Sequence, residues 1–313
     1  MIIIFNRSAA NFSKDTVGYM DATTNGQKDS NNSGMTWRTN QFSKNGGRLR
    51  MFFRVELDIF YMNKLVPSGV KVKILMKQTN NLFRMMTGPN DPKVKLRIIN
   101  AKWHPQFIKL DPMLILESEK IFADHVALLP FTRCDCTFET LPSGAPSFRI
   151  PDAMNGIIPS SMIIMFTKTL ARLGDSTLNP YNFIAKKLQK ITVQSDTEIL
   201  FELICDFPND CTAAYFNLFA NKYTKGRPVN ITKKEFTGGY CMIFVELSSP
   251  IEIRDESGVW HKQKTGKISI NIQFKDSLTE SIDCLIYGFS LDCIQVNHDR
   301  HCLLASHLYR KHM

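Results

Sequence analysis

Long apolar runs are missing from this 313-residue sequence. No segment approaches the roughly 18 consecutive apolar residues that a membrane-spanning helix needs. Glycine and proline are also scarce, with 16 and 14 residues, which excludes collagen-like and low-complexity chains. The apolar start at residues 1–5 is shorter than the core of a signal peptide, and no basic residue precedes it. We therefore expect a soluble intracellular protein that is not secreted through a signal peptide.

The sequence also lacks the short motifs that carry common enzymatic chemistry. It contains no Gly-x-Gly-x-x-Gly and no Gly-x-Ser-x-Gly. Gly266 and Lys267 resemble the end of a phosphate-binding loop, but His261 stands where that loop needs its first glycine. His104 and His125 are isolated, and no nucleophile, base and acid form a catalytic pattern. We expect no enzymatic activity and no cofactor.

Eight cysteines are present, but the length of the chain and the missing secretion signal argue against a disulfide framework. Most of them lie in apolar segments, which is typical of small buried residues. The densest group of soft metal ligands is Cys293, His298, His301 and Cys302, which could hold zinc. Its spacing matches no zinc-finger pattern. A solvated, basic, histidine-rich tail over residues 298–313 explains the same residues, and we predict no metal site.

Positive charge is concentrated in one part of the chain. The formal net charge is +10, and residues 61–110 hold ten lysines and arginines but only one acid, Asp91. Residues 70–74 and 94–98 alternate cations with apolar residues, which predicts strands with one apolar and one cationic face. That cationic face is a candidate contact for packaged DNA, or else the solvated outer face of a sheet. Its members are Lys71, Lys73, Lys95 and Arg97.

The local pattern is that of an all-β protein with short helices in its connections. It predicts strands over residues 50–60, 71–76, 82–86, 93–101, 131–139, 161–168, 191–193, 197–204, 240–247, 267–274 and 282–291. Asp111 and Pro112 predict a helix to residue 124, residues 232–235 form a capping box, and residues 213–221 suggest a third helix. Residues 142–159 are predicted as a loop. About ten strands favour a sandwich or barrel.

Several blocks of the sequence, taken in order, resemble capsid proteins encoded by Maverick/Polinton elements and adintovirus-like viruses. Each block is short, but they keep the same order across about residues 55 to 301. They include an Asn-Pro-aromatic-Asn-Phe motif and an Asp-Arg pair near the end. The blocks are residues 65–74, 83–86, 94–101, 129–133, 179–183, 231–236, 239–240, 266–274, 284–289 and 297–300.

The resemblance implies a hexon-like major capsid protein of the double jelly-roll type, located in the virion and assembled inside the host cell. It implies a homotrimer of this chain, with other capsid proteins and packaged DNA as further partners and no membrane. Family members carry a further β-rich region before the point where this sequence starts. We therefore expect a jelly-roll domain over residues 48–297, with residues 1–47 as a loop, a disordered arm or a remnant of a first jelly roll.

Two other functions remain open from the sequence. A chain of this length also suits a minor, penton-like capsid subunit. A domesticated β-sandwich that binds nucleic acid non-specifically through the cationic strands is the second alternative. An enzyme on a cupin-like jelly roll is disfavoured, because its metal ligands would have to lie on strands, whereas the histidines cluster in the tail.

Overall fold

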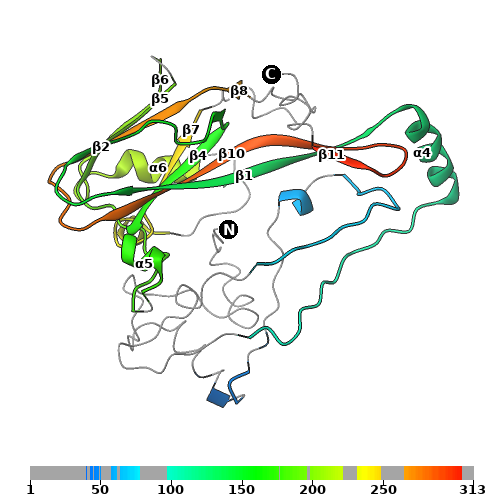
Figure 1. Cartoon of the computed structure of the whole chain (residues 1–313), viewed down its shortest axis with the longest axis horizontal. Helices are drawn as coiled ribbons and strands as arrows, with labels where there is room; N and C mark the ends of the chain where they lie inside the picture. The colour runs from blue at the N-terminus through cyan, green and yellow to red at the C-terminus, as the bar shows by residue number, and fades with distance from the viewer. Residues whose placement is uncertain are drawn as a thin grey trace.

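A computed structural model describes most of the chain from residue 97 onward and a few shorter segments before it (Figure 1). The longer described segments are residues 58–61, 64–77, 97–175, 177–195, 198–220, 231–247 and 264–304. The remaining described residues are 40, 43–44, 46–48 and 50. All statements about the structure below concern these residues.

Two antiparallel sheets form a β-sandwich. The first sheet has the order β1-β10-β4-β7, with β11 added beside β10. Its strands are β1 (Ala127–Leu141), β10 (Ile282–Val296), β4 (Ser161–Lys168), β7 (Met242–Glu246) and β11 (Cys302–Leu304). The second sheet has the order β2-β9-β5-β6. Its strands are β2 (Ser147–Ile150), β9 (Ile268–Phe274), β5 (Leu188–Ser195) and β6 (Glu198–Ile204), and a short pair joins β3 (Ile157–Ile158) to β8 (Lys264–Thr265).

The strand order is that of a jelly roll. Strand pairs are nested along the chain: β1 pairs with β10, β2 with β9, β4 with β7, and β5 with β6. Eight strands nested in this way make two four-stranded sheets that share one core, which is the jelly-roll arrangement. The prediction of an all-β jelly-roll sandwich with short helices in its connections is confirmed.

The core lies between the two sheets. Phe166 of β4 and Phe274 of β9 meet edge to face across it, with ring centroids 5.5 Å apart. Strand β9 alternates between buried and more exposed residues, as a strand with one apolar face does. Strand β4 is buried along nearly its whole length, because its neighbours β10 and β7 flank it and the loop at Pro180 lies against Thr167.

Four α-helices connect the strands within the described residues: α4 (Pro112–Asp124), α5 (Thr169–Leu173), α6 (Thr212–Ala220) and α7 (Lys233–Thr237). The side chain of Asp111 caps α4 by accepting a hydrogen bond from the amide of Met113. Thr232 and Glu235 form the reciprocal capping box of α7. Both helix starts were predicted from the sequence, and both predictions are confirmed.

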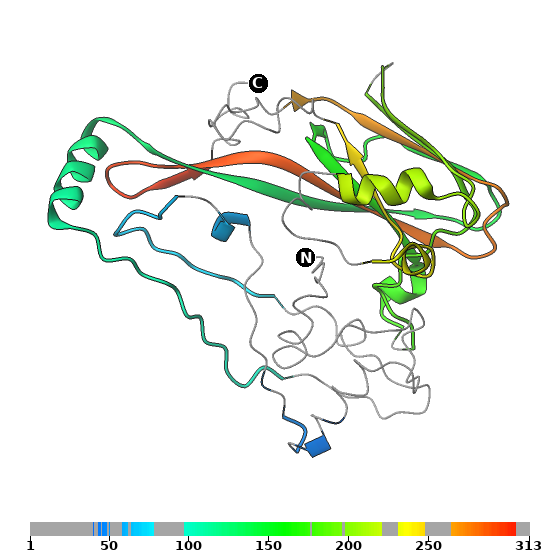
Figure 2. The same cartoon turned by 180° about the vertical axis from the view of Figure 1, so that it is seen from behind.

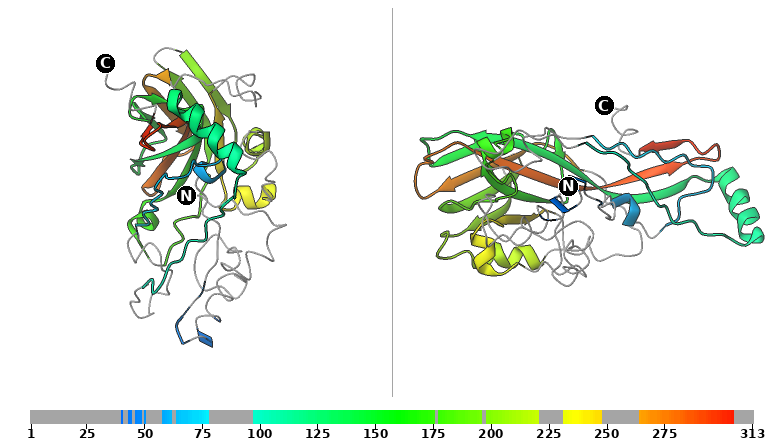
Figure 3. Two further views of the ribbon diagram at one scale, coloured as in Figure 1. Left: turned by 90° about the vertical axis from the view of Figure 1, so that its right-hand side faces the viewer. Right: turned by 90° about the horizontal axis from the view of Figure 1, so that it is seen from below.

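Strands β1 and β10 form a ribbon that extends beyond the rest of the sandwich (Figures 1 and 2). They pair over fifteen residues, from Ala127 opposite Val296 to Leu141 opposite Ile282, a length of about 50 Å. Helix α4 stands at the far end of this ribbon, and the extended residues 97–111 lead to it (Figure 3). The ribbon therefore holds α4 away from the core.

The basic N-terminal strands are the main error of the sequence prediction. Residues 71–76 form no strand, and neither do residues 97–101 of the strand predicted over 93–101. A strand needs a bonded neighbour, and no ladder pairs these segments with any described residue. Residues 58–61 form a 3-10 helix instead of the end of a strand. The strands predicted at 50–60 and 82–86 otherwise lie outside the described residues, apart from Arg50, which is in no strand.

The loop predicted over residues 142–159 is also wrong in part, because it contains β2 and β3. These strands have only four and two residues, so their own pattern is too short to mark them. Pairing with β9 and β8 defines them. No helix in the described part of the chain has both the length and the apolar character needed to cross a membrane.

Candidate functional site

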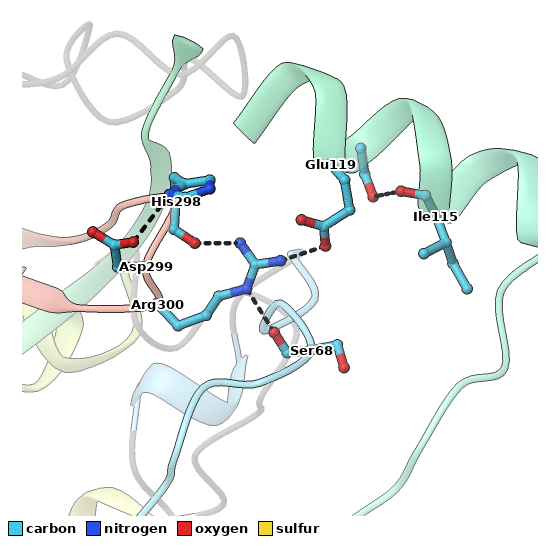
Figure 4. A network of polar contacts seen from close by, with 7 residues as sticks. Ser68, Ile115, Glu119, His298, Asp299 and Arg300 are labelled. Atoms are coloured by element: carbon cyan, nitrogen blue, oxygen red, sulfur yellow. Dashed lines mark hydrogen bonds and ion pairs between the residues drawn. The ribbon is translucent and has the colours of Figure 1, made fainter. Parts of the chain in front are cut away.

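The side chain of Arg300 joins three segments that lie far apart in the sequence (Figure 4). Its Nε donates a hydrogen bond to the carbonyl of Ser68 at 2.8 Å, and Nη1 donates to the carbonyl of His298 at 3.1 Å. Nη2 pairs with the carboxylate of Glu119 on α4. The guanidinium carbon also lies 4.6 Å from the ring centroid of Phe122, which is a cation–π distance. We call this set of contacts the Arg300 junction.

The backbone on both sides of the junction is shaped for this contact. Arg300 has a φ of +65°, a left-handed conformation that is uncommon for a residue with a side chain. The amide of Arg300 donates to the carbonyl of Asn297, and the amide of His301 donates to the Asn297 side chain. Gly69 faces the junction with a φ of +86°, and a Cβ there would lie 3.3 Å from Cγ of Arg300. Glycine at this turn therefore lets the two segments approach closely.

Replacing Arg300 with alanine is expected to release residues 64–77 from α4 and the β10–β11 connection. The change removes three polar contacts and a ring contact, so these residues should open more often. Limited trypsin cleavage within residues 64–77 should become about fivefold faster, the factor that corresponds to about 1 kcal/mol. The matched control is Arg133→Ala, because Arg133 pairs with Asp135 on β1. Equal cleavage rates in the two variants would contradict this role of Arg300.

The four predicted DNA-facing residues do not form one face of a sheet. Lys71 and Lys73 are exposed in the segment 64–77, and Arg97 is exposed in the segment 97–111, neither of which is a strand. Lys95 lies outside the described residues. Within the described part of the chain, Lys71, Lys73 and Arg97 have no ion-pair partner.

The candidate zinc ligands do not converge on one point. Cys293 is buried in β10, where burial raises the pKa of its thiol and so favours the protonated form. His298 contacts the carboxylate of Asp299 at 3.1 Å, and Cys302 is exposed at the start of β11. Among the described residues, no three histidine, cysteine, aspartate or glutamate side chains are placed to hold a metal ion.

Three further buried cysteines behave as small apolar residues. Burial raises the pKa of Cys205 to about 12 and raises those of Cys241 and Cys284 as well. The thiols therefore stay protonated near neutral pH, which makes them poor nucleophiles and metal ligands. All three side chains belong to the main hydrophobic core.

Exposed apolar residues are concentrated in α4 and in the two described segments that precede it along the chain. Sixteen of the 27 exposed large apolar side chains in the described residues lie in segments 64–77 and 97–124. Phe107 is 88% exposed, and α4 has no buried residue at all along its thirteen residues. Apolar surface concentrated in this way marks an interaction site in a folded protein. We call the two extended segments, residues 64–77 and 97–111, the basic arms.

Sequence reasoning identified the cations of the basic arms but missed the Arg300 junction. The blocks at residues 65–74 and 297–300 both belong to the family resemblance. The hydrogen bond from Arg300 to the carbonyl of Ser68 shows that the two blocks are in contact. Nothing local signals this contact, because 232 residues separate its two partners. The exposure of α4 was missed as well, although its apolar residues were recognised.

Comparison with known proteins gives matches at the level of structure alone. No protein-family model matches the sequence, and no curated protein matches it. Among solved structures, a chain of the Sputnik virophage is similar, with 12% identity and a TM-score of 0.36. The match covers 57% of this chain and 39% of that chain.

Two further structural neighbours are also proteins of viruses. The mavirus major capsid protein has 10% identity and a TM-score of 0.30, with 59% of this chain and 43% of that chain covered. The PBCV-1 protein VP54 has 10% identity and a TM-score of 0.34, with 63% and 54% covered. The matched region thus spans less than half the length of the first two neighbours. These three structural neighbours come from the Sputnik virophage, mavirus and PBCV-1.

Proposed function

We propose that this chain is a structural, non-enzymatic subunit of a viral capsid and is located in the virion. The observation that carries the proposal is the nested strand order, with β1-β10-β4-β7 packed on β2-β9-β5-β6. Double-sheet jelly rolls of this order are a common building block of viral capsids, although lectins and cupins also use them. The ordered sequence blocks favour a capsid protein over a lectin or a cupin. They also favour a Polinton or adintovirus-like element as its source.

The exposed apolar side chains of α4 and the basic arms also support a subunit role. A monomer gains nothing from keeping α4 and the basic arms in water, because burying their apolar side chains would be favourable. Capsid subunits bury such surfaces against neighbours in a symmetric assembly. We propose that the partners are copies of this chain and other capsid proteins. We also propose that the chain is a hexon-like major subunit and not a penton-like minor one.

Assembly of the purified full chain tests this function. Sedimentation velocity over a range of protein concentrations, followed by negative-stain electron microscopy, should show closed oligomers of uniform size. Trimers would support the hexon-like assignment, and rings of five would support the penton-like one. A chain that stays monomeric at the highest soluble concentration, both alone and with the capsid proteins of its source, would overturn the proposal.

Nucleic-acid binding is a second candidate function. It is favoured by Lys71, Lys73 and Arg97, which are exposed and have no ion-pair partner among the described residues. A variant in which Lys71, Lys73, Lys95 and Arg97 are all replaced by glutamate should lose salt-sensitive retention of DNA. In fluorescence anisotropy with duplex DNA, each lost phosphate contact should reduce the slope of log K against log salt by roughly 0.9. The control is Lys267→Glu, an exposed cation outside the basic arms. An unchanged slope would remove these residues from any DNA contact.

A further inference from the structure

We propose that the basic arms of one copy pack against the outer face of α4 in a second copy, so that each contact joins two different surfaces. This inference rests on the proposed subunit function and names the surfaces through which copies associate. It explains why segments 64–77 and 97–124 hold most of the exposed apolar residues of the described chain. The same surfaces also carry opposite charge.

Among the described residues, helix α4 contacts its own molecule through one face. Phe122 and Glu119 contact Arg300, and Ser118 and Phe122 are partly buried. Because side chains three and four positions apart share a face of a helix, the opposite face carries a separate set of residues. That outer face consists of Met113, Leu116, Glu117, Lys120 and Asp124, all of them exposed.

The outer face of α4 combines apolar and acidic groups. Met113 is 70% exposed and Leu116 is 64% exposed, so both offer apolar area to a partner. Glu117 and Asp124 have no ion-pair partner in the described part of the chain. The whole helix carries three acids and one lysine, so its net charge is negative.

The basic arms carry the complementary charge together with their own apolar residues. They contain seven lysines and arginines and a single acid, Asp111, whose side chain is already used to cap α4. Leu75 and Phe107 are among the most exposed apolar residues of the molecule. An arm from a neighbouring copy would therefore offer cations to the acidic groups of this outer face and apolar side chains to Met113 and Leu116.

The backbone of the arms pairs with no described strand. Residues 71–77 and 97–110 form no ladder within the part of the chain that the structure describes. Unpaired extended backbone is a ready template for association with another chain. The alternating pattern at residues 70–74, which predicted a strand, fits a segment that gains its neighbour on assembly.

A contact between two different surfaces repeats from copy to copy, and it closes into a ring when the rotation between copies allows. The same chain provides both surfaces, so no second protein is needed. This geometry distinguishes the inference from a two-fold contact of α4 with itself. In that case two acidic faces would meet, and their repulsion would oppose association.

Charge reversal and charge exchange test the contact by sedimentation velocity of the full chain. We expect Glu117→Lys with Asp124→Lys to weaken association at least tenfold, and Lys71→Glu with Lys73→Glu to do the same. Combining all four changes should restore most of the association, because the charges of both surfaces are exchanged. The control pair is Glu198→Lys with Lys267→Glu, two exposed residues on the sandwich, which should leave association unchanged.

The outcomes separate this inference from the proposed function. If the wild-type chain forms oligomers that neither double variant weakens, the contact lies elsewhere and only the inference fails. If the lysine variant still associates but loses DNA binding, the arms serve nucleic acid and the inference is also overturned. If the wild-type chain never associates, the proposed function itself fails. Circular dichroism of each variant shows that loss of association does not come from unfolding.

Discussion

Replacing Asp283 with alanine should lower the free energy of unfolding by about 3–5 kcal/mol, the range for breaking a buried ion pair. The Asp283 side chain is 0% exposed at the start of β10. Its Oδ1 accepts hydrogen bonds from the hydroxyls of Thr140 at 2.7 Å and Thr169 at 3.0 Å, and its Oδ2 pairs with Nε of Arg172. The variant leaves one cation and two hydroxyl groups without their acceptor.

The position of this carboxylate explains the size of the effect. Thr140 lies on β1 and Arg172 on α5, so Asp283 links two neighbouring strands to the helix that follows β4. The guanidinium of Arg172 also lies 4.0 Å from the ring centroid of Phe138, which keeps it beside the sheet. Breaking the pair thus frees a whole corner of the sandwich.

Urea unfolding followed by tryptophan fluorescence or circular dichroism measures this loss. The matched control is Asp276→Ala, because Asp276 pairs with Lys187 and both side chains are 60% exposed. Exposed pairs contribute little to stability, so its midpoint should stay close to that of the wild type. The unfolding midpoint of Asp283→Asn should lie between those of the two alanine variants, since its amide oxygen still accepts hydrogen bonds from the threonines. Similar midpoints for Asp283→Ala and Asp276→Ala would show that the buried pair does not stabilise the fold.

Replacing Phe166 with alanine is expected to cost about 3–5 kcal/mol of stability, as large-to-small changes of a buried aromatic do. Phe166 is fully buried in the middle of the sandwich and meets Phe274 of the opposite sheet edge to face. The variant opens a cavity between the two sheets, which the surrounding strands cannot close because their hydrogen bonds fix them. Phe274 would also lose its aromatic partner across the core.

The control for this cavity is Phe216→Ala on α6. Phe216 is largely exposed, so its loss opens no cavity and should change the unfolding midpoint little. Comparing the two in the same urea titration separates the loss of a packed ring from the loss of phenylalanine as such. If both variants unfold at the same midpoint, Phe166 does not hold the sheets together.

Local features of the sequence determined the elements that need no distant partner. Helix α4 begins where Asp111 caps it, and α7 begins at its capping box, because both signals act within one turn. Strand β4 has the predicted limits, residues 161–168, since its apolar run is continuous and buried. Most strands of the sandwich could be located in this way.

Distant pairing decided the elements that the sequence predicted poorly. Strand β10 runs to Val296, five residues beyond its predicted end, because β1 pairs with it along its full length. The short strand β2 exists through its ladder with β9. Residues 71–76 have a clear strand pattern but form none, since no described strand lies beside them. A hydrophobic period of two indicates that a segment can form a strand, but the strand forms only where a neighbouring strand can hydrogen-bond to it.

Composition and short-range pattern are enough to predict the all-β class, the helix caps and the cluster of positive charge. Long-range contacts define the nested jelly-roll order, the Arg300 junction and the isolation of α4 at the end of the β1–β10 ribbon. These three features depend on contacts between residues more than 100 positions apart. No local segment of the sequence indicates how favourable such contacts are.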